Sequence, residues 1–402
     1  MSYLTTANRL RHSRALRVGV AIGLGVTARA IVVRATANTP PGLVDWERAE
    51  RIARRRLRSV PGGLTPAQLR ATETAYARHM DRVVPLLEER LGAALPGVVE
   101  RHAVVSREEW ARANMGTFKS LVEHLEPHVM PKLPDGSVRS GVAAATTRLV
   151  TTGQVGFLLG FLGGRVLGQY DVALLSAEQD PGRLLYVEEN IRATARQVQV
   201  PVDDFRLWVA LHETTHAFEL EAHPWLRPYI RERMERQVAL FARETRRLQR
   251  RGLVHIARRW RSAAAQGSIR GLLASPEQRR LFAEVQLVMS LMEGFSDWVM
   301  DEVGAEVLPD IPGIRRRFEA RRGQRRRAID RLMARLTGMD MKLEQYRRGE
   351  RFVSGVHRAG GSAAIEHLWD GPETLPTEAE MQDPAAWVRR VVPGVIEAGG
   401  SQ

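Results

Sequence analysis

Residues 212–216 read His-Glu-Thr-Thr-His, and no other segment of this 402-residue chain restricts its fold as strongly. Two histidines four residues apart lie one turn from each other on the same face of an α-helix, where their imidazoles can hold one zinc ion. Glu213 stands beside the first histidine, where a carboxylate can take a proton from a metal-activated water. The segment therefore has to be helical for this chemistry.

The residues around the pentapeptide predict such a helix. Asp203 or Asp204 can cap the first turn, and the apolar residues between 205 and 211 then form one helix face. His223 is followed directly by Pro224, so we expect the helix to end at His223.

A zinc hydrolase usually supplies three protein ligands and leaves the fourth position open. His223 comes one residue later than the third histidine of metzincins, and Glu219 lies too close to His216 on the same helix for good ligand geometry. Gluzincins place a glutamate ligand on a downstream helix, with an aspartate four residues after it. Glu293 and Asp297 have that spacing, which makes Glu293 the favoured third ligand.

The helix expected to carry Glu293 is well marked. Ser275–Gln278 offers an N-cap serine, a proline at the first position and a capping-box glutamine, and Gly304 is the expected stop. Glu293 falls inside an apolar run, and a buried carboxylate needs a partner such as a metal. Asp297 or Asp301 is expected to orient a ligand imidazole through its second nitrogen.

Helical patterns dominate the rest of the chain, so the sequence predicts a mainly α fold with few short strands. Helices are expected to begin at Thr65 and Ser106, and further helical patterns cover 226–250, 313–337 and 377–391. Strands are expected only around 103–105 and 184–187.

The most apolar tract, residues 149–164, is too short to span a bilayer and predicts a buried helix. Its glycines at 156, 160 and 164 recur every four residues and leave a smooth face that a second helix can approach. No membrane span is expected.

The chain has no cysteine, which excludes disulfides and cysteine ligands and fits a cytoplasmic location. Its net charge is +14, and only three of its basic residues are lysine. Arginine clusters such as those at 246–251, 258–261 and 321–327 leave nucleic acid open as a partner. The favoured interpretation is that the arginines pair along exposed helix faces.

Residues 1–42 are expected to form an extension, and 396–402 a tail. The extension is basic and then apolar, so export is the lesser alternative to the cytoplasm. Residues 43–395 are expected to form the functional domain, in one piece or as two lobes over roughly 43–200 and 201–395.

Beyond the metal motif, the chain resembles a bacterial family of zincin-like metallopeptidases of uncharacterised substrate, often labelled coenzyme F420 biosynthesis-associated. The resemblance covers roughly residues 43–395. It rests on Val44–Trp46, Trp110, Asn114, Leu167–Asp171, Asn190, Asp204–Trp208, His212–His216, Pro224–Arg227, Met292–Gly294, Val299–Asp301, Lys342, Gln345–Tyr346, Gly349, Trp369, Pro372–Glu373, Leu375–Pro376 and Trp387.

The resemblance implies a zincin-like pair of metal helices, with His212, His216 and Glu293 as ligands of one Zn²⁺ per chain and Glu213 as general base. It implies a hydrolase of peptide or other amide bonds that uses a metal-activated water, and it supplies no substrate. Histidine and carboxylate ligands also suit iron, cobalt or nickel. Two alternatives stay open: a non-catalytic scaffold tied by its metal, and a basic protein that binds nucleic acid or acidic partners.

The sequence does not select the group that stabilises the oxyanion. The candidates are Tyr170, Arg227, Tyr229, Tyr346, His357 and His367.

Overall fold

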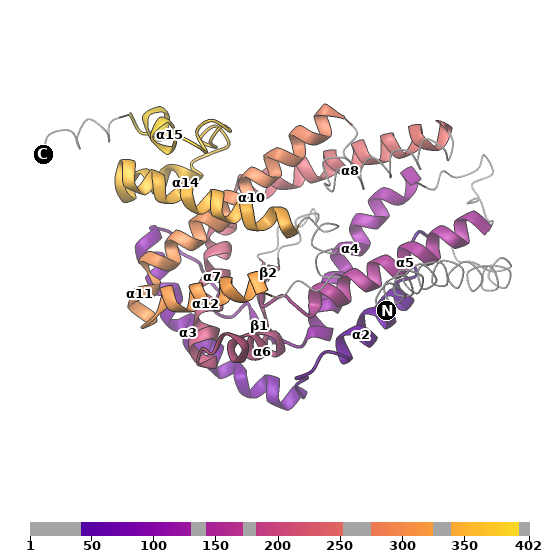
Figure 1. Cartoon of the computed structure of the whole chain (residues 1–402), viewed down its shortest axis with the longest axis horizontal. Helices are drawn as coiled ribbons and strands as arrows, with labels where there is room; N and C mark the ends of the chain where they lie inside the picture. The colour runs from indigo at the N-terminus through magenta and orange to yellow at the C-terminus, as the bar shows by residue number, and fades with distance from the viewer. Residues whose placement is uncertain (1–41, 130–141, 172–181, 252–274, 325–338, 394–402) are drawn as a thin grey trace, which may run out of the picture.

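The computed structural model describes the chain except residues 1–41, 130–141, 172–181, 252–274, 325–338 and 394–402 (Figure 1). The described residues form a mostly helical fold with three short strands, which confirms the predicted fold class. In chain order the elements are α2 (Trp46–Arg58), α3 (Pro66–Leu91), β1 (His102–Val105), α4 (Arg107–Val129), α5 (Val142–Gly163), β2 (Gly168–Asp171), β3 (Arg183–Val187), α6 (Glu188–Val198), α7 (Val202–Ala222), α8 (Leu226–Arg251), α10 (Pro276–Glu302), α11 (Gly304–Val307), α12 (Ile311–Gln324), α14 (Met339–Glu366), η2 (His367–Trp369) and α15 (Pro384–Val391).

Several predictions fall on residues outside this description. They concern nearly all of the expected extension over 1–42, the tail over 396–402 and the arginine cluster at 258–261. The division of 43–395 into one piece or two lobes stays a prediction.

The expected helix starts at Thr65, Ser106 and Ser275 are present as capping boxes. The Ser275 hydroxyl accepts a hydrogen bond from the backbone N–H of Gln278, and the Gln278 side chain accepts one from the backbone of Ser275. Thr65 makes the same pair of bonds with Gln68, and Ser106 is paired in this way with Glu109. Each box satisfies two amides that the first turn leaves without a helical partner.

Two predicted boundaries were wrong, at the start of α7 and at the start of the last predicted helix. Helix α7 begins at Val202 after Pro201, so Asp203 and Asp204 lie in its first turn and neither is its cap. Their charges still suit the positive end of the helix dipole. The predicted stop of α10 at Gly304 is confirmed, because α10 ends at Glu302 with Val303 as its C-cap. Gly304 then begins the short helix α11, where a side chain would meet Ile311 Cδ1 at 1.9 Å. The last helix is α15, which is capped by Asp383 and so begins after residue 377.

The three strands form one sheet in the order β1-β3-β2. Strands β1 and β3 are parallel and fall where the sequence predicted them, whereas β2 runs antiparallel to β3 and was missed. Its four residues, Gly-Gln-Tyr-Asp, lack the run of branched apolar side chains that marks a strand. Strand β2 nevertheless matters, because it contacts α7.

The predicted apolar helix is α5, and its glycines do allow close packing. A side chain at Gly156 would lie 2.6 Å from the Ala49 carbonyl oxygen, and one at Gly160 would lie 3.1 Å from that of Ala53, both on α2. Figure 1 shows α2 and α5 side by side. None of the helices in the described part of the chain is long and apolar enough to cross a membrane.

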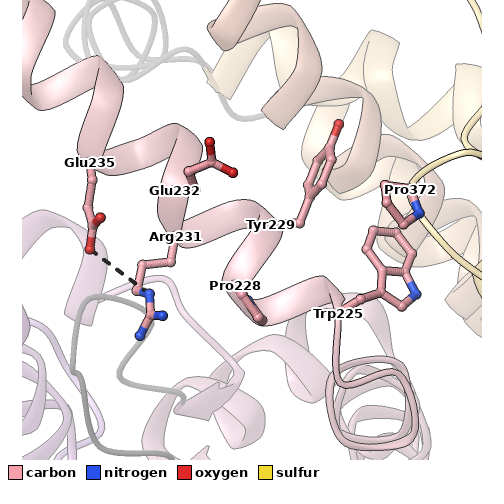
Figure 2. A pocket seen from close by; sticks show the side chains of 7 residues that line it. All are labelled: Trp225, Pro228, Tyr229, Arg231, Glu232, Glu235 and Pro372. Carbon is pink, nitrogen blue, oxygen red and sulfur yellow. Dashed lines mark ion pairs between the residues drawn. The ribbon is translucent and has the colours of Figure 1, made fainter.

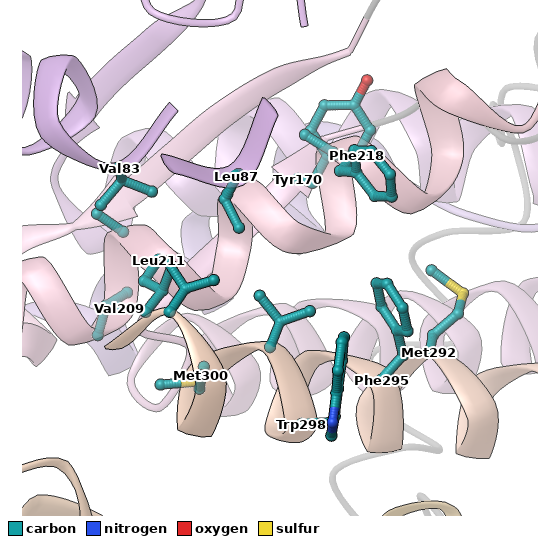
Figure 3. Close-up of a cluster of buried hydrophobic side chains, with 14 of the residues drawn as sticks. Val83, Leu87, Tyr170, Val209, Leu211, Phe218, Met292, Phe295, Trp298 and Met300 are labelled. Atoms are coloured by element: carbon teal, nitrogen blue, oxygen red, sulfur yellow. The ribbon is translucent and has the colours of Figure 1, made fainter. Parts of the chain in front are cut away.

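Helix α7 lies at the centre of the fold. It contacts α3, α6, α8, α10, β2 and β3, and buried residues occur all around it. Figure 3 shows this core: α3 supplies Val83 and Leu87, α7 supplies Leu211 and Phe218, and α10 faces them with Phe295. Because neighbouring elements contact this helix on several sides, its position in the fold is strongly fixed.

Helices α10 and α14 cross at two glycines, Gly294 and Gly349. A side chain at Gly349 would lie 1.8 Å from the carbonyl oxygen of Ser290, and one at Gly294 would lie 2.2 Å from the backbone of Gly349. Both atoms are backbone and cannot move aside like a flexible side chain. Because Gly294 follows Glu293, the crossing also fixes where Glu293 stands.

We expect Gly349→Ala to lower the free energy of unfolding by roughly 1–3 kcal/mol, because the added methyl forces the two backbones apart. Urea unfolding of the metal-free protein measures this. Gly116→Ala on the exposed face of α4 is the matched control. A side chain there meets nothing within 4 Å, so the change should stabilise the protein by up to about 1 kcal/mol. Equal urea midpoints for Gly349→Ala and wild type would show that the crossing tolerates a side chain.

Candidate metal centre

The structure brings His212, His216 and Glu293 together from α7 and α10. One ligand atom from each lies within 4.8 Å of the other two. Glu293 Oε2 is 3.7 Å from His212 Nε2 and 4.0 Å from His216 Nε2. Among the described residues, these three side chains are spaced closely enough to bind one metal ion together.

The group fits a zinc ion by chemistry and by size. Two nitrogens and one carboxylate oxygen are ligands that zinc accepts. Ligands at about 2.0–2.2 Å from one ion lie roughly 3.4 Å apart at a tetrahedral angle. The observed 3.7 and 4.0 Å between Glu293 and the two histidines exceed this separation by a few tenths of an ångström, and all three ligand atoms lie within 4.8 Å of one another.

The two imidazoles are held at a steep angle to each other. Their ring planes make an angle of 77°, with centroids 4.7 Å apart. Trp208, one turn before His212, stacks on the His212 ring at an angle of 6°, which restricts its rotation. Across the helix pair, the Ser296 hydroxyl on α10 lies 3.5 Å from the His212 carbonyl oxygen. Both histidines therefore present Nε2 to Glu293 from a constrained ring.

His216 is hydrogen-bonded on its far side by Glu219. The distance from His216 Nδ1 to Glu219 Oε2 is 2.7 Å. Burial lowers the pKa of His216, but the Glu219 hydrogen bond and the charges of Glu219, Glu293 and Glu213 outweigh it and raise this pKa to about 10. Burial likewise raises the pKa of Glu219, and His216 opposes this rise, leaving the Glu219 pKa at about 7. A divalent cation would thus meet a site rich in negative charge.

Glu213 is 9% exposed and lies against the edge strand β2. A side chain at Gly168 would lie 2.5 Å from Glu213 Cγ and 2.8 Å from its Oε1. Only a residue without a side chain leaves space for this carboxylate, so Gly168 sets the position of Glu213. This role of Gly168 was not predicted from the sequence, because the short strand β2 was not predicted.

Asp297 and Asp301, expected behind a ligand imidazole, instead contact Arg315 of α12. Arg315 lies 3.5 Å from Asp297 Oδ1 and 2.9 Å from Asp301 Oδ2, and it donates to the Asp297 carbonyl oxygen at 2.9 Å. Burial raises the pKa of Asp297 to about 7, against the lowering effect of Arg315. The carboxylate that the structure places behind a ligand histidine is Glu219, at i+3 from His216 on the same helix. The (i, i+3) rule could have found it.

The residues that could stabilise the oxyanion differ in the contacts that their side chains make. The Tyr170 hydroxyl donates to Glu221, and His367 Nδ1 lies 2.6 Å from Asp370. His357 packs edge-on against Trp298 with ring centroids 5.7 Å apart. The side chain of Tyr346 lies outside the described residues. The choice among these candidates stays open.

A surface groove of about 460 Å³ lies at the start of α8, and none of its lining residues is a candidate ligand (Figure 2). Trp225, Pro228, Tyr229 and Pro372 form its apolar part. The indole N–H of Trp225 donates to the Trp369 carbonyl oxygen at 2.7 Å. The groove therefore begins just beyond the C-terminal end of α7 and is separate from the metal centre.

The arginines of α8 and α10 pair with carboxylates. Arg233 and Arg280 both contact Glu284 at 2.8 Å, and Arg236 lies 3.3 Å from Glu277. These contacts support the interpretation that the arginines pair along helix faces.

Two comparisons with known proteins match most of this chain. A family model described as zincin-like metallopeptidase matches residues 44–388. The chain is also 35% identical to a protein from Chloroflexus aurantiacus whose crystal structure is described as a "putative hydrolase with a novel fold". The alignment covers 86% of this chain and 98% of that one, with a TM-score of 0.64. No curated protein matches the chain.

Proposed function

Because the chain belongs to the zincin-like metallopeptidase family, we propose that it is a zinc-dependent hydrolase of peptide or other amide bonds, with one zinc per chain. The observation that carries the proposal is the meeting of His212, His216 and Glu293 within 4.8 Å, with Glu213 next to the first ligand. The similarity to a protein described as a hydrolase supports the same reaction class.

The proposed reaction divides its work among these side chains. When bound, zinc supplies Lewis-acid activation of the attacking water and of the substrate carbonyl. Glu213 accepts a proton from that water as the new C–O bond forms, and it returns the proton to the leaving nitrogen as the C–N bond breaks. Gly168 leaves the space in which the Glu213 carboxylate stands.

Glu213 also separates this proposal from a metal site that only ties helices together. A structural zinc site is closed by four protein ligands and has no use for a general base beside it. Here three side chains gather, and a fourth, the carboxylate of Glu213, is held against β2. That arrangement is typical of a site that keeps one position for water and substrate.

The test is to count the metal and then to remove it. Protein purified without a histidine tag or chelators should contain about one zinc per chain, and it should cleave members of a mixed peptide library as read by mass spectrometry. A chelator should stop cleavage, and added zinc should restore it. Folded wild-type protein that neither contains nor takes up zinc would refute the proposal. Stable zinc without cleavage of any peptide or amide would leave a metal-tied scaffold.

A further inference from the structure

Glu219 is a buried acid in an unusual setting. It is 0% exposed on α7, and its Oε1 is buried without a hydrogen-bond partner among the described residues. Glu188, also 0% exposed, is neutralised by Arg192 and Arg206 and accepts a bond from Tyr76. Burying a carboxylate is costly unless it is paired, and the hydrogen-bonding partner of the Glu219 carboxylate in the described structure is an imidazole.

The chemistry of that contact fixes the state of the imidazole. When Glu219 is ionised it has no proton to give, so His216 Nδ1 then donates and Glu219 Oε2 accepts, at 2.7 Å. Nδ1 then keeps its proton, and Nε2 is the nitrogen that turns toward Glu293. A metal ligand has to be the unprotonated nitrogen, so this hydrogen bond selects the nitrogen that faces the other ligands.

We propose that Glu219 is the positioning residue of the metal centre, which fixes the ring of His216 and makes its Nε2 a stronger donor. This inference rests on the proposed zinc site. The sequence had predicted a supporting carboxylate on α10, whereas Glu219 lies on α7, the helix that carries both histidines. Asp297 and Asp301 are engaged by Arg315, whereas Glu219 reaches His216 from one turn along α7.

The charges around His216 point the same way. Carboxylate oxygens lie on both sides of the ring, with Glu219 Oε2 at 2.7 Å from Nδ1 and Glu293 Oε2 at 4.0 Å from Nε2. No arginine or lysine is among the partners of Glu219 in the described structure. When both imidazoles are in the neutral form that binds a metal, these carboxylates leave an excess of negative charge that a divalent cation would balance.

The first readout needs no metal and no activity. In metal-free wild-type protein, His216 Nδ1–H should give a downfield NMR proton resonance, coupled to the ring nitrogen and slow to exchange with water. Loss of the signal in His216→Ala assigns it. The signal should persist when zinc is added, because zinc takes Nε2. It should disappear in Glu219→Ala, where the acceptor is gone.

The second readout is zinc affinity, measured by competition with a chelating dye. Glu219→Ala should bind zinc roughly 10–100-fold more weakly than wild type. Glu219→Gln retains an acceptor oxygen without the charge, so it should lose less affinity and keep the Nδ1–H signal. If Glu219→Ala does not fold, the zinc affinity of Glu219→Gln tests the proposal in its place. Asp301→Asn is the matched control and should stay within about twofold of wild type, because Asp301 contacts Arg315.

The two readouts separate this inference from the proposed function. If wild type binds no zinc, the proposed function fails, and the Nδ1–H signal still reports whether Glu219 holds His216. If zinc binds but Glu219→Ala retains wild-type affinity, or Asp301→Asn loses as much as Glu219→Ala, the positioning role is overturned. Survival of the Nδ1–H signal in Glu219→Ala overturns it as well.

Discussion

Glu213→Gln should lower kcat/KM for amide hydrolysis by roughly 10²- to 10⁴-fold while the protein keeps its zinc, because glutamine fills the same space but cannot accept the proton of the attacking water. Glu213 is not among the three gathered ligands, so the zinc content should stay at one per chain. Cleavage of the best peptide from the library screen and metal analysis of the same sample are the two measurements. Glu73→Gln, at an exposed position of α3, removes the same charge and should match wild type.

Measuring cleavage and zinc content in the same sample distinguishes a general base from a metal ligand. Full activity in Glu213→Gln would remove Glu213 from the mechanism. Loss of zinc together with activity would instead make Glu213 part of the metal site. Only loss of cleavage with retained zinc agrees with a general base held against Gly168.

Replacing any one of the three ligands should weaken zinc binding by more than the roughly 100-fold that a supporting residue can cost. His212→Ala, His216→Ala and Glu293→Ala remove groups that lie within 4.8 Å of one another. Competition with a chelating dye gives each affinity, and urea unfolding of the metal-free variants shows whether the fold is intact. Zinc affinity close to that of wild type in a folded variant would exclude that residue as a ligand.

Zinc affinity should also depend on pH, and the raised pKa of His216 sets the direction of the change. His216 has a raised pKa of about 10, so it carries a proton on Nε2 in the metal-free protein at neutral pH. Zinc has to displace that proton, so between pH 7 and 9 wild-type affinity should rise with pH, by about tenfold per unit from this group. His216→Ala lacks the proton and should show a shallower dependence. An equal slope in both proteins would contradict ligation by His216.

The metal helix could be predicted from sequence because its signal is local. His212 and His216 are one turn apart, so the helix alone brings them together. Glu293 is 77 residues beyond His216, and its place followed from the spacing to Asp297 and the apolar run around it. The structure brings Glu293 to the histidines, as expected.

Other features of the site depend on contacts that one segment does not reveal. Gly168 matters because β2 passes beside Glu213, and a four-residue strand with one apolar side chain carries little signal. Asp297 and Asp301 contact Arg315, whose position depends on how α12 folds back onto α10. Glu219 was weighed only as a ligand, although its spacing from His216 already allowed a supporting hydrogen bond.

The central place of α7 bears on how the protein acquires its metal. Its neighbours on all sides are α3, α6, α8, α10, β2 and β3, so its backbone amides can reach solvent only when much of the core opens. We therefore expect the amides of this helix to exchange slowly with solvent even in the metal-free protein, which hydrogen exchange would measure. If the proposed site is correct, metal binding would then require no folding step, and the metal-free framework would be able to bind an ion again.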